Sequence, residues 1–126
     1  SGVSNASRDI IAAEAKGNKR AHLANLIFYR RVLDYIGQYY VRLGGCDLII
    51  FSAGIGENSD IYREKICEGL KESLGVVINK KVNTGLRGKE AVLSDKSSKI
   101  KVVLIPTDEE VMIARDAFAL LKKKGK

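Results

Sequence analysis

Two glycines that stand one residue apart after a short apolar run mark a turn that could bind a ligand. They are Gly54 and Gly56 in segment 52–59, which reads Ser-Ala-Gly-Ile-Gly-Glu-Asn-Ser. Glycine tolerates positive φ and has no Cβ, so a ligand can lie against the backbone. Free amides at the start of a following helix favour a phosphate, and Asn58 can bond sugar hydroxyls or a base edge. The segment is neither a P-loop nor a full GxGxxG motif, so a tight turn that only reverses the chain remains open.

A second turn, at 106–110, places acidic side chains at the start of a helix. It reads Pro-Thr-Asp-Glu-Glu. Acids in this position interact favourably with the positive end of the helix dipole, which is a sufficient structural reason for them. The functional alternative is a magnesium site, because Mg²⁺ takes one or two carboxylates together with waters and substrate phosphates. One glutamate here would suit that arrangement if the glycine turn lies close by.

The remaining reactive side chains do not form a catalytic or zinc-binding set. His22 is the one histidine, and it has no partner close in sequence from which a nucleophilic triad could be built. Arg8 could contact a phosphate or stack on a base, although an arginine at a helix start is more often solvated. Cys46 and Cys67 lack CxxC partners, so we expect no structural zinc and two reduced thiols in a cytoplasmic protein.

Both turns require strands that bring them to the same place. Continuous apolar runs predict buried strands at 47–52 and 100–105, and each ends immediately before one of the turns. A shorter strand is predicted at 91–94. The first strand carries a continuous apolar run at 48–51, which favours a parallel neighbour. In such a sheet ligands gather at the carboxyl ends of the strands, beside helix N-termini.

Helical periodicity accounts for most of the remaining chain. The predicted helices cover 9–16, 19–43, 60–74 and 108–123. Asn58 or Ser59 can cap the third of these helices. Thr107 and Glu110 match a capping box for the last one. Because strands and helices alternate, the sequence predicts an α/β layer architecture.

Composition narrows the functional classes further. The 126 residues suit one domain or part of one. The 22 Lys+Arg and 15 Asp+Glu give a net charge of +7, and residues 122–126 carry four of the lysines. A basic nucleic-acid binder would rest on this charge alone, because no aromatic residues interleave with it, so we expect no nucleic-acid partner. We also expect neither a membrane span nor a retained signal peptide.

Taken together, these segments resemble the carboxyl-terminal part of the acetate/propionate/butyrate kinase family. The resemblance is carried by Ser1-Gly2-Val3-Ser4 with Arg8-Asp9, by segment 51–59, and by segment 105–110 with Ile113-Ala114-Arg115. It implies a partial ribonuclease-H-like α/β domain of the actin, sugar kinase and acetate kinase superfamily. On this reading residues 1–126 are the carboxyl-terminal nucleotide-binding part of an acetate-kinase-like protein whose amino-terminal domain is absent.

The resemblance also assigns roles to individual residues. It places these residues at the nucleotide: Ala6, Ser7, Arg8, Gly54, Ile55, Gly56, Glu57 and Asn58. It places Glu109 at the magnesium ion. The family usually has an aspartate where Ala6 stands and a bulky apolar residue where Ser7 stands, which puts the adenosine contacts at this end in question.

The activity implied is magnesium-dependent phosphoryl transfer between ATP and acetate, in a cytoplasmic homodimer without a nucleic-acid or membrane partner. In this family the acyl pocket and the catalytic residues lie upstream of the segments quoted. We therefore expect no catalytic residue in this chain, an inactive isolated fragment, and no indication of which short carboxylate is used. The alternative is a dimerisation or structural module that does not bind nucleotide.

Overall fold

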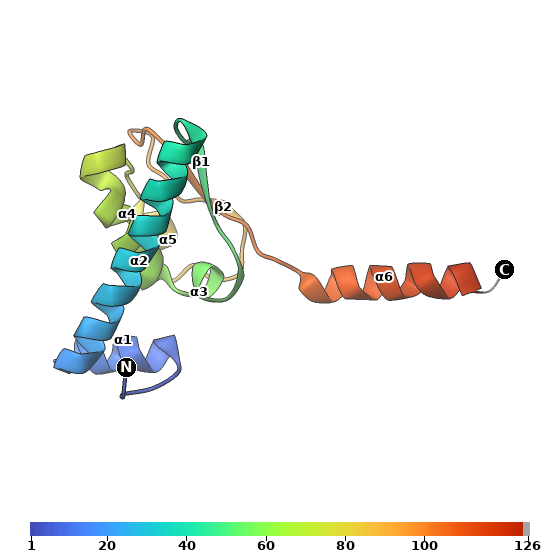
Figure 1. Ribbon diagram of the computed structural model, residues 1–126, viewed down its shortest axis with the longest axis horizontal. Coiled ribbons are helices and arrows are strands. Elements are labelled where there is room, and N and C mark those ends of the chain that lie inside the picture. The colour runs from blue at the N-terminus through green and yellow to red at the C-terminus, as the bar shows by residue number, and fades with distance from the viewer. Residues whose placement is uncertain (125–126) are drawn as a thin grey trace.

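The computed structural model describes the backbone of residues 1–124 and every side chain up to residue 108, with those of residues 111–115 and 117–119 beyond it. Its elements, in chain order, are α1 (Ser7–Ala15), α2 (Lys19–Leu43), β1 (Leu48–Phe51), α3 (Ala53–Asn58), α4 (Asp60–Leu74), α5 (Lys80–Asn83), β2 (Ala91–Val92), β3 (Lys101–Leu104) and α6 (Glu109–Lys124) (Figure 1). The predicted α/β alternation is confirmed, with α3 and α5 as additional short helices.

The strands form one sheet in the order β1-β3-β2. β1 pairs with β3 in parallel, with Ile49 opposite Val102 and Phe51 opposite Leu104, which confirms the expected parallel neighbour. β2 joins the other side of β3 in the antiparallel sense. Because parallel strands end at the same edge, the turns that follow β1 and β3 both start there.

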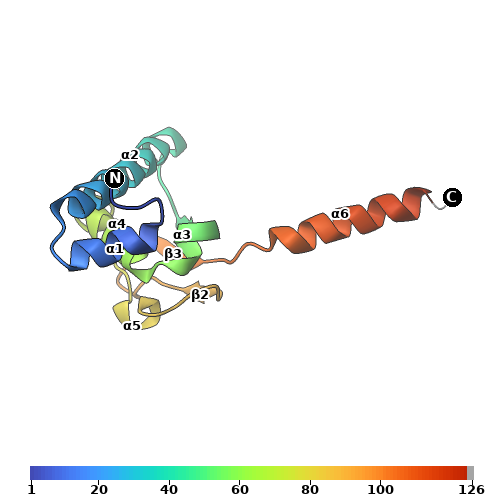
Figure 2. The same ribbon diagram turned by 90° about the horizontal axis from the view of Figure 1, so that it is seen from below.

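The core lies between this sheet and helix α4. Ile66, Cys67 and Leu70 of α4 are almost fully buried together with Val102 and Leu104 of β3. The two α4 side chains Ile66 and Leu70 are four residues apart, so they share one face of the helix. Helix α2 packs on α4 in turn, and both helices lie on the same side of the sheet (Figures 1 and 2).

The helix ends follow the sequence signals. Asn18 caps α2 by accepting from two backbone amides, and Gly44 ends it in the left-handed conformation. Ser59 caps α4 by accepting from the amide of Tyr62. Helix α6 leaves the carboxyl end of β3 and projects away from the rest of the fold (Figures 1 and 2). Within the described part of the chain, no helix combines the length and the apolar character that crossing a membrane demands.

Candidate functional site

The glycine turn after β1 is a short distorted helix, α3, rather than an open loop. Ala53 has φ 52° and Gly54 has φ 27° with ψ −109°. Positive φ is accessible to glycine at little cost, which explains the residue type at Gly54. The side-chain amide of Asn58 donates to the Gly54 carbonyl at 3.0 Å and closes the turn on itself. The backbone is therefore held close to the end of β1.

The carboxylate of Glu57 joins the two predicted site turns. It is only 9% exposed, and its Oε1 accepts from the Ala53 amide at 2.6 Å, the Thr107 amide at 2.7 Å and the Thr107 hydroxyl at 2.9 Å. These bonds, chiefly the one from the Thr107 backbone, hold the pKa of Glu57 below its ordinary value. The turns are thus adjacent, and a negative charge lies between them.

The start of α6 differs from the predicted capping box. The Asp108 carboxylate accepts from the Val111 amide at 3.0 Å and so caps the helix. The Thr107 hydroxyl is engaged with Glu57 instead, so the prediction of Thr107 as the cap is wrong. Glu109 is the first residue of α6. Its side chain and that of Glu110 lie outside the described residues.

A cavity of about 720 Å³ opens beside α3. It lies between the start of α1 and the consecutive segments α3 and α4, which are distant from α1 in sequence. Of the eight residues that the resemblance assigns to the nucleotide, six line it: Ala6, Ser7, Arg8, Gly54, Ile55 and Asn58. Gly56 and Glu57 do not, because they face Arg63 and Thr107. Their predicted contact with a ligand stays a prediction.

Arg63 supports the glycine turn, although the motifs in the sequence did not single it out. Its side chain is fully buried. It donates to the carbonyls of Gly56 at 2.9 Å and Glu57 at 3.0 Å, and to the Asn83 side chain at 2.8 Å and the Leu86 carbonyl at 2.7 Å. Burial lowers its pKa. Arg63 thus fixes α3 to the segment that follows α5.

The sequence did contain a signal for Arg63. It precedes Ile66 by three residues and Leu70 by seven, so it lies on the apolar face of α4. A cation on such a face needs fixed hydrogen-bond acceptors. Asp60 and Ile61, which also line the cavity, and Arg87, which does so from another segment, were likewise not indicated.

The other reactive side chains do not line this cavity. His22 lies 2.7 Å from the carboxylate of Glu14, which also accepts from Asn25. Both cysteines are free thiols, and burial raises the pKa of Cys67 to about 12. Neither His22 nor Cys67 is arranged as a nucleophile or general base.

A known protein family matches most of the chain. The model of the acetokinase family matches residues 1–115. The chain belongs to the acetokinase family. It is 54% identical over 122 residues to the acetate kinase of Treponema denticola, which covers 97% of this chain and 30% of that relative.

Solved acetokinase-family structures show the same fold. The crystal structure of Porphyromonas gingivalis acetate kinase matches 96% of this chain with a TM-score of 0.83 and 45% identity, and a propionate kinase from Francisella tularensis matches 90% with 0.78 and 33%. The expected partial domain of this kinase fold is confirmed. The chain spans about 30% of the length of these relatives.

The predicted magnesium ligand, Glu109, stays a prediction. Among the described residues no group of three or more His, Cys, Asp or Glu side chains could hold a metal. The carboxylates of Glu57 and Asp108 are already used as acceptors. Glu109 follows directly at the start of α6. Mg²⁺ bound mainly by phosphates and waters needs no more than one such carboxylate.

Proposed function

We propose that the complete protein to which this chain belongs transfers a phosphoryl group reversibly from ATP to acetate or a similar short-chain carboxylate, giving acetyl phosphate and ADP. This chain supplies the nucleotide side of that reaction. One observation carries the proposal: Arg8, Gly54 and Asn58, on separate or strained segments, line the same cavity of about 720 Å³. That volume lies within the usual range for small-molecule and cofactor sites.

The lining offers each chemical part of a nucleotide a suitable group. Ile55 and Ile61 supply apolar surface for a base, and Asn58 supplies donors and acceptors for a ribose. Arg8 supplies positive charge for phosphates. Ala6 and Ser7 present small side chains to the cavity at the start of α1.

Glu109 is the residue proposed to hold Mg²⁺, through water, at the start of α6. It lies two residues after Thr107, which is bonded to the glycine turn through Glu57. When bound, Mg²⁺ neutralises charge on the transferring phosphates. Phosphoryl transfer depends on groups from both sides of the substrate, so we expect the isolated chain to be inactive.

The proposal includes a cytoplasmic homodimer without a nucleic-acid or membrane partner. The exposed apolar side chains of α2 also favour a second candidate, a purely structural dimerisation module. Tyr39 is 59% exposed and Leu43 73% exposed on this helix. Such a module predicts self-association and no response to nucleotide.

An acetyl phosphate assay on the complete protein tests the proposal. ATP, Mg²⁺ and acetate, propionate or butyrate are the substrates, so the assay also identifies the carboxylate. We expect Glu109→Ala to lower metal-dependent activity about a hundredfold without lowering the melting temperature. Glu90→Ala, an exposed glutamate away from the cavity, is the matched control. Unchanged activity and magnesium dependence in Glu109→Ala would exclude the metal role.

A further inference from the structure

Arg87 is a second arginine of the cavity to which no role has been assigned. It lies in segment 84–90, between α5 and β2, and lines the same cavity as Arg8. Its side chain is exposed. Within the described part of the chain it makes no hydrogen bond or ion pair. A guanidinium that lines a cavity without a protein partner is available to a ligand.

The backbone on both sides of Arg87 is fixed. The Leu86 carbonyl accepts from the buried side chain of Arg63 at 2.7 Å. The Gly88 amide donates to the Glu57 carbonyl at 3.3 Å. Residues 86 and 88 are thereby tied to α4 and α3, which bound the cavity together with α1. Arg87 is consequently held at the cavity wall by its neighbours and not by contacts of its own.

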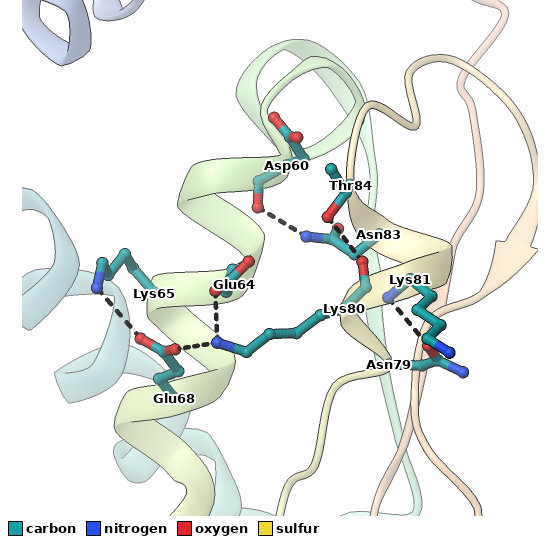
Figure 3. A network of polar contacts seen from close by, with 9 residues as sticks. All are labelled: Asp60, Glu64, Lys65, Glu68, Asn79, Lys80, Lys81, Asn83 and Thr84. Atoms are coloured by element: carbon teal, nitrogen blue, oxygen red, sulfur yellow. Dashed lines mark hydrogen bonds and ion pairs between the residues drawn. The ribbon is translucent and has the colours of Figure 1, made fainter. Parts of the chain in front are cut away.

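The start of this segment is attached to α4 as well. The Gly85 amide donates to the Asp60 carboxylate at 2.8 Å, and the Asn83 side chain donates to the Asp60 carbonyl at 2.9 Å (Figure 3). Lys80 of α5 reaches Glu64 and Glu68 of α4 at 2.7 and 2.9 Å (Figure 3). The whole connection from α5 to Arg87 therefore keeps one position relative to α4.

The chemistry of this wall suits a base better than a phosphate. Asp60 and Ile61 are the other lining residues of α4 near the segment. The Asp60 carboxylate repels an anion, whereas the apolar Ile61 and a planar guanidinium both suit the face of a purine. The α1 wall contributes Arg8 without a lining carboxylate, and it is the better position for phosphates.

We propose that Arg87 contacts the nucleotide base and stacks its guanidinium plane on the purine. This inference rests on the proposed function, because it specifies which part of the nucleotide this wall of the cavity receives. A stacked arginine acts through shape as well as charge, so lysine cannot replace it.

Ligand affinities of the complete protein test this contact. ADP and adenosine are titrated by calorimetry, or by competition with a fluorescent ADP analogue, against the unsubstituted protein, Arg87→Ala and Arg87→Lys. We expect Arg87→Ala to weaken both ligands by the same factor, about tenfold, and Arg87→Lys to be nearly as weak. Lys89→Ala is the matched control, because Lys89 is an exposed cation of the same segment that does not line the cavity.

Three results would overturn the inference. If Arg87→Ala loses affinity for ADP alone, Arg87 contacts a phosphate, and if Arg87→Lys binds as tightly as the unsubstituted protein, only its charge matters. If neither variant loses affinity, Arg87 makes no contact with the nucleotide. Equal melting temperatures of the variants show that the exposed position tolerates substitution. Failure of the proposed function gives a different result, because the unsubstituted protein would then bind neither ADP nor adenosine. The inference about Arg87 would fail in that case too.

Discussion

The turns after β1 and β3 leave the same edge of the sheet, yet they are built differently. The first folds back as α3, with a positive φ at Gly54. Arg63 anchors it by donating to the Gly56 carbonyl. The second runs from β3 into α6, and it is attached to the first through Thr107 and Glu57. The first turn contributes Gly54, Ile55 and Asn58 to the wall of the cavity, whereas no described residue of the second turn lines it.

The comparison also separates two kinds of anchor. Arg63 is fully buried and bonds several carbonyls, so it supports the first turn regardless of ligand. Glu57 joins the turns through an ionised carboxylate, so its contribution depends on pH. When Glu57 is protonated or replaced, the first turn should therefore keep its structure, because Arg63 still holds it. The second turn should lose its attachment to the first, because the Glu57–Thr107 bonds are lost.

The largest effect is expected from Arg63→Ala, which would break the anchor of the first turn. It removes the Arg63 hydrogen bonds to the carbonyls of Gly56, Glu57 and Leu86 and the buried side chain that makes them, and we expect the free energy of unfolding to fall by about 3 kcal/mol or more. Urea unfolding measures this loss. Arg30→Ala, an exposed arginine of α2, should change stability by less than about 0.5 kcal/mol. Equal losses would show that Arg63 is not the anchor.

A smaller effect is expected from the backbone of the first turn. Gly54→Ala places a side chain on a residue with φ 27°, and the strain should lower the free energy of unfolding by about 1–2 kcal/mol. At Gly56 an added Cβ would meet the Phe51 backbone at an ordinary 3.5 Å. Gly56→Ala should therefore cost less than about 0.5 kcal/mol. If the two variants are equally stable in thermal unfolding, the left-handed conformation at Gly54 is not required.

The smallest effect concerns the link between the turns. The pKa of Glu57 is lower in the folded protein than its ordinary value of 4.5. Its stabilising contribution is therefore complete above about pH 4.5 and is lost as the pH falls through the folded pKa. We expect the difference in unfolding free energy between the unsubstituted protein and Glu57→Gln to shrink below pH 4.5. If the difference in unfolding free energy stays constant down to pH 3, or if Glu90→Gln shows the same pH dependence, the Glu57 carboxylate does not join the two turns.

The elements of this fold could be predicted because their signals are local. Apolar runs and caps located β1, β3, α2 and α4. The strand at 91–94 is shorter than expected. Its regular register with β3 covers Ala91 and Val92, and it ends where the amides of Leu93 and Ser94 both donate to the Val102 carbonyl. Segment 53–58 forms α3 rather than an open turn. Its helix depends on Arg63 and Glu57 reaching contacts that no local pattern specifies.

The site was predictable only where a motif carries its own geometry. Gly54 and Asn58 line the cavity as their types and spacing suggested, and Arg8 joins them from α1. Arg87 could not be found in this way, because its place at the cavity follows from bonds to Arg63 and Glu57 at positions on either side of it. Thr107 was assigned to a cap because the local pattern contains no sign of the distant Glu57.

Hydrogen exchange of the complete protein, with and without ADP and Mg²⁺, tests most directly whether this cavity is the nucleotide site. ADP should slow exchange at the amides of 54–58, 6–12 and 85–88, the segments that carry most of the lining residues, while the turn at 95–99 is unchanged. Binding of ADP with protection elsewhere, and none at 54–58, would contradict the account.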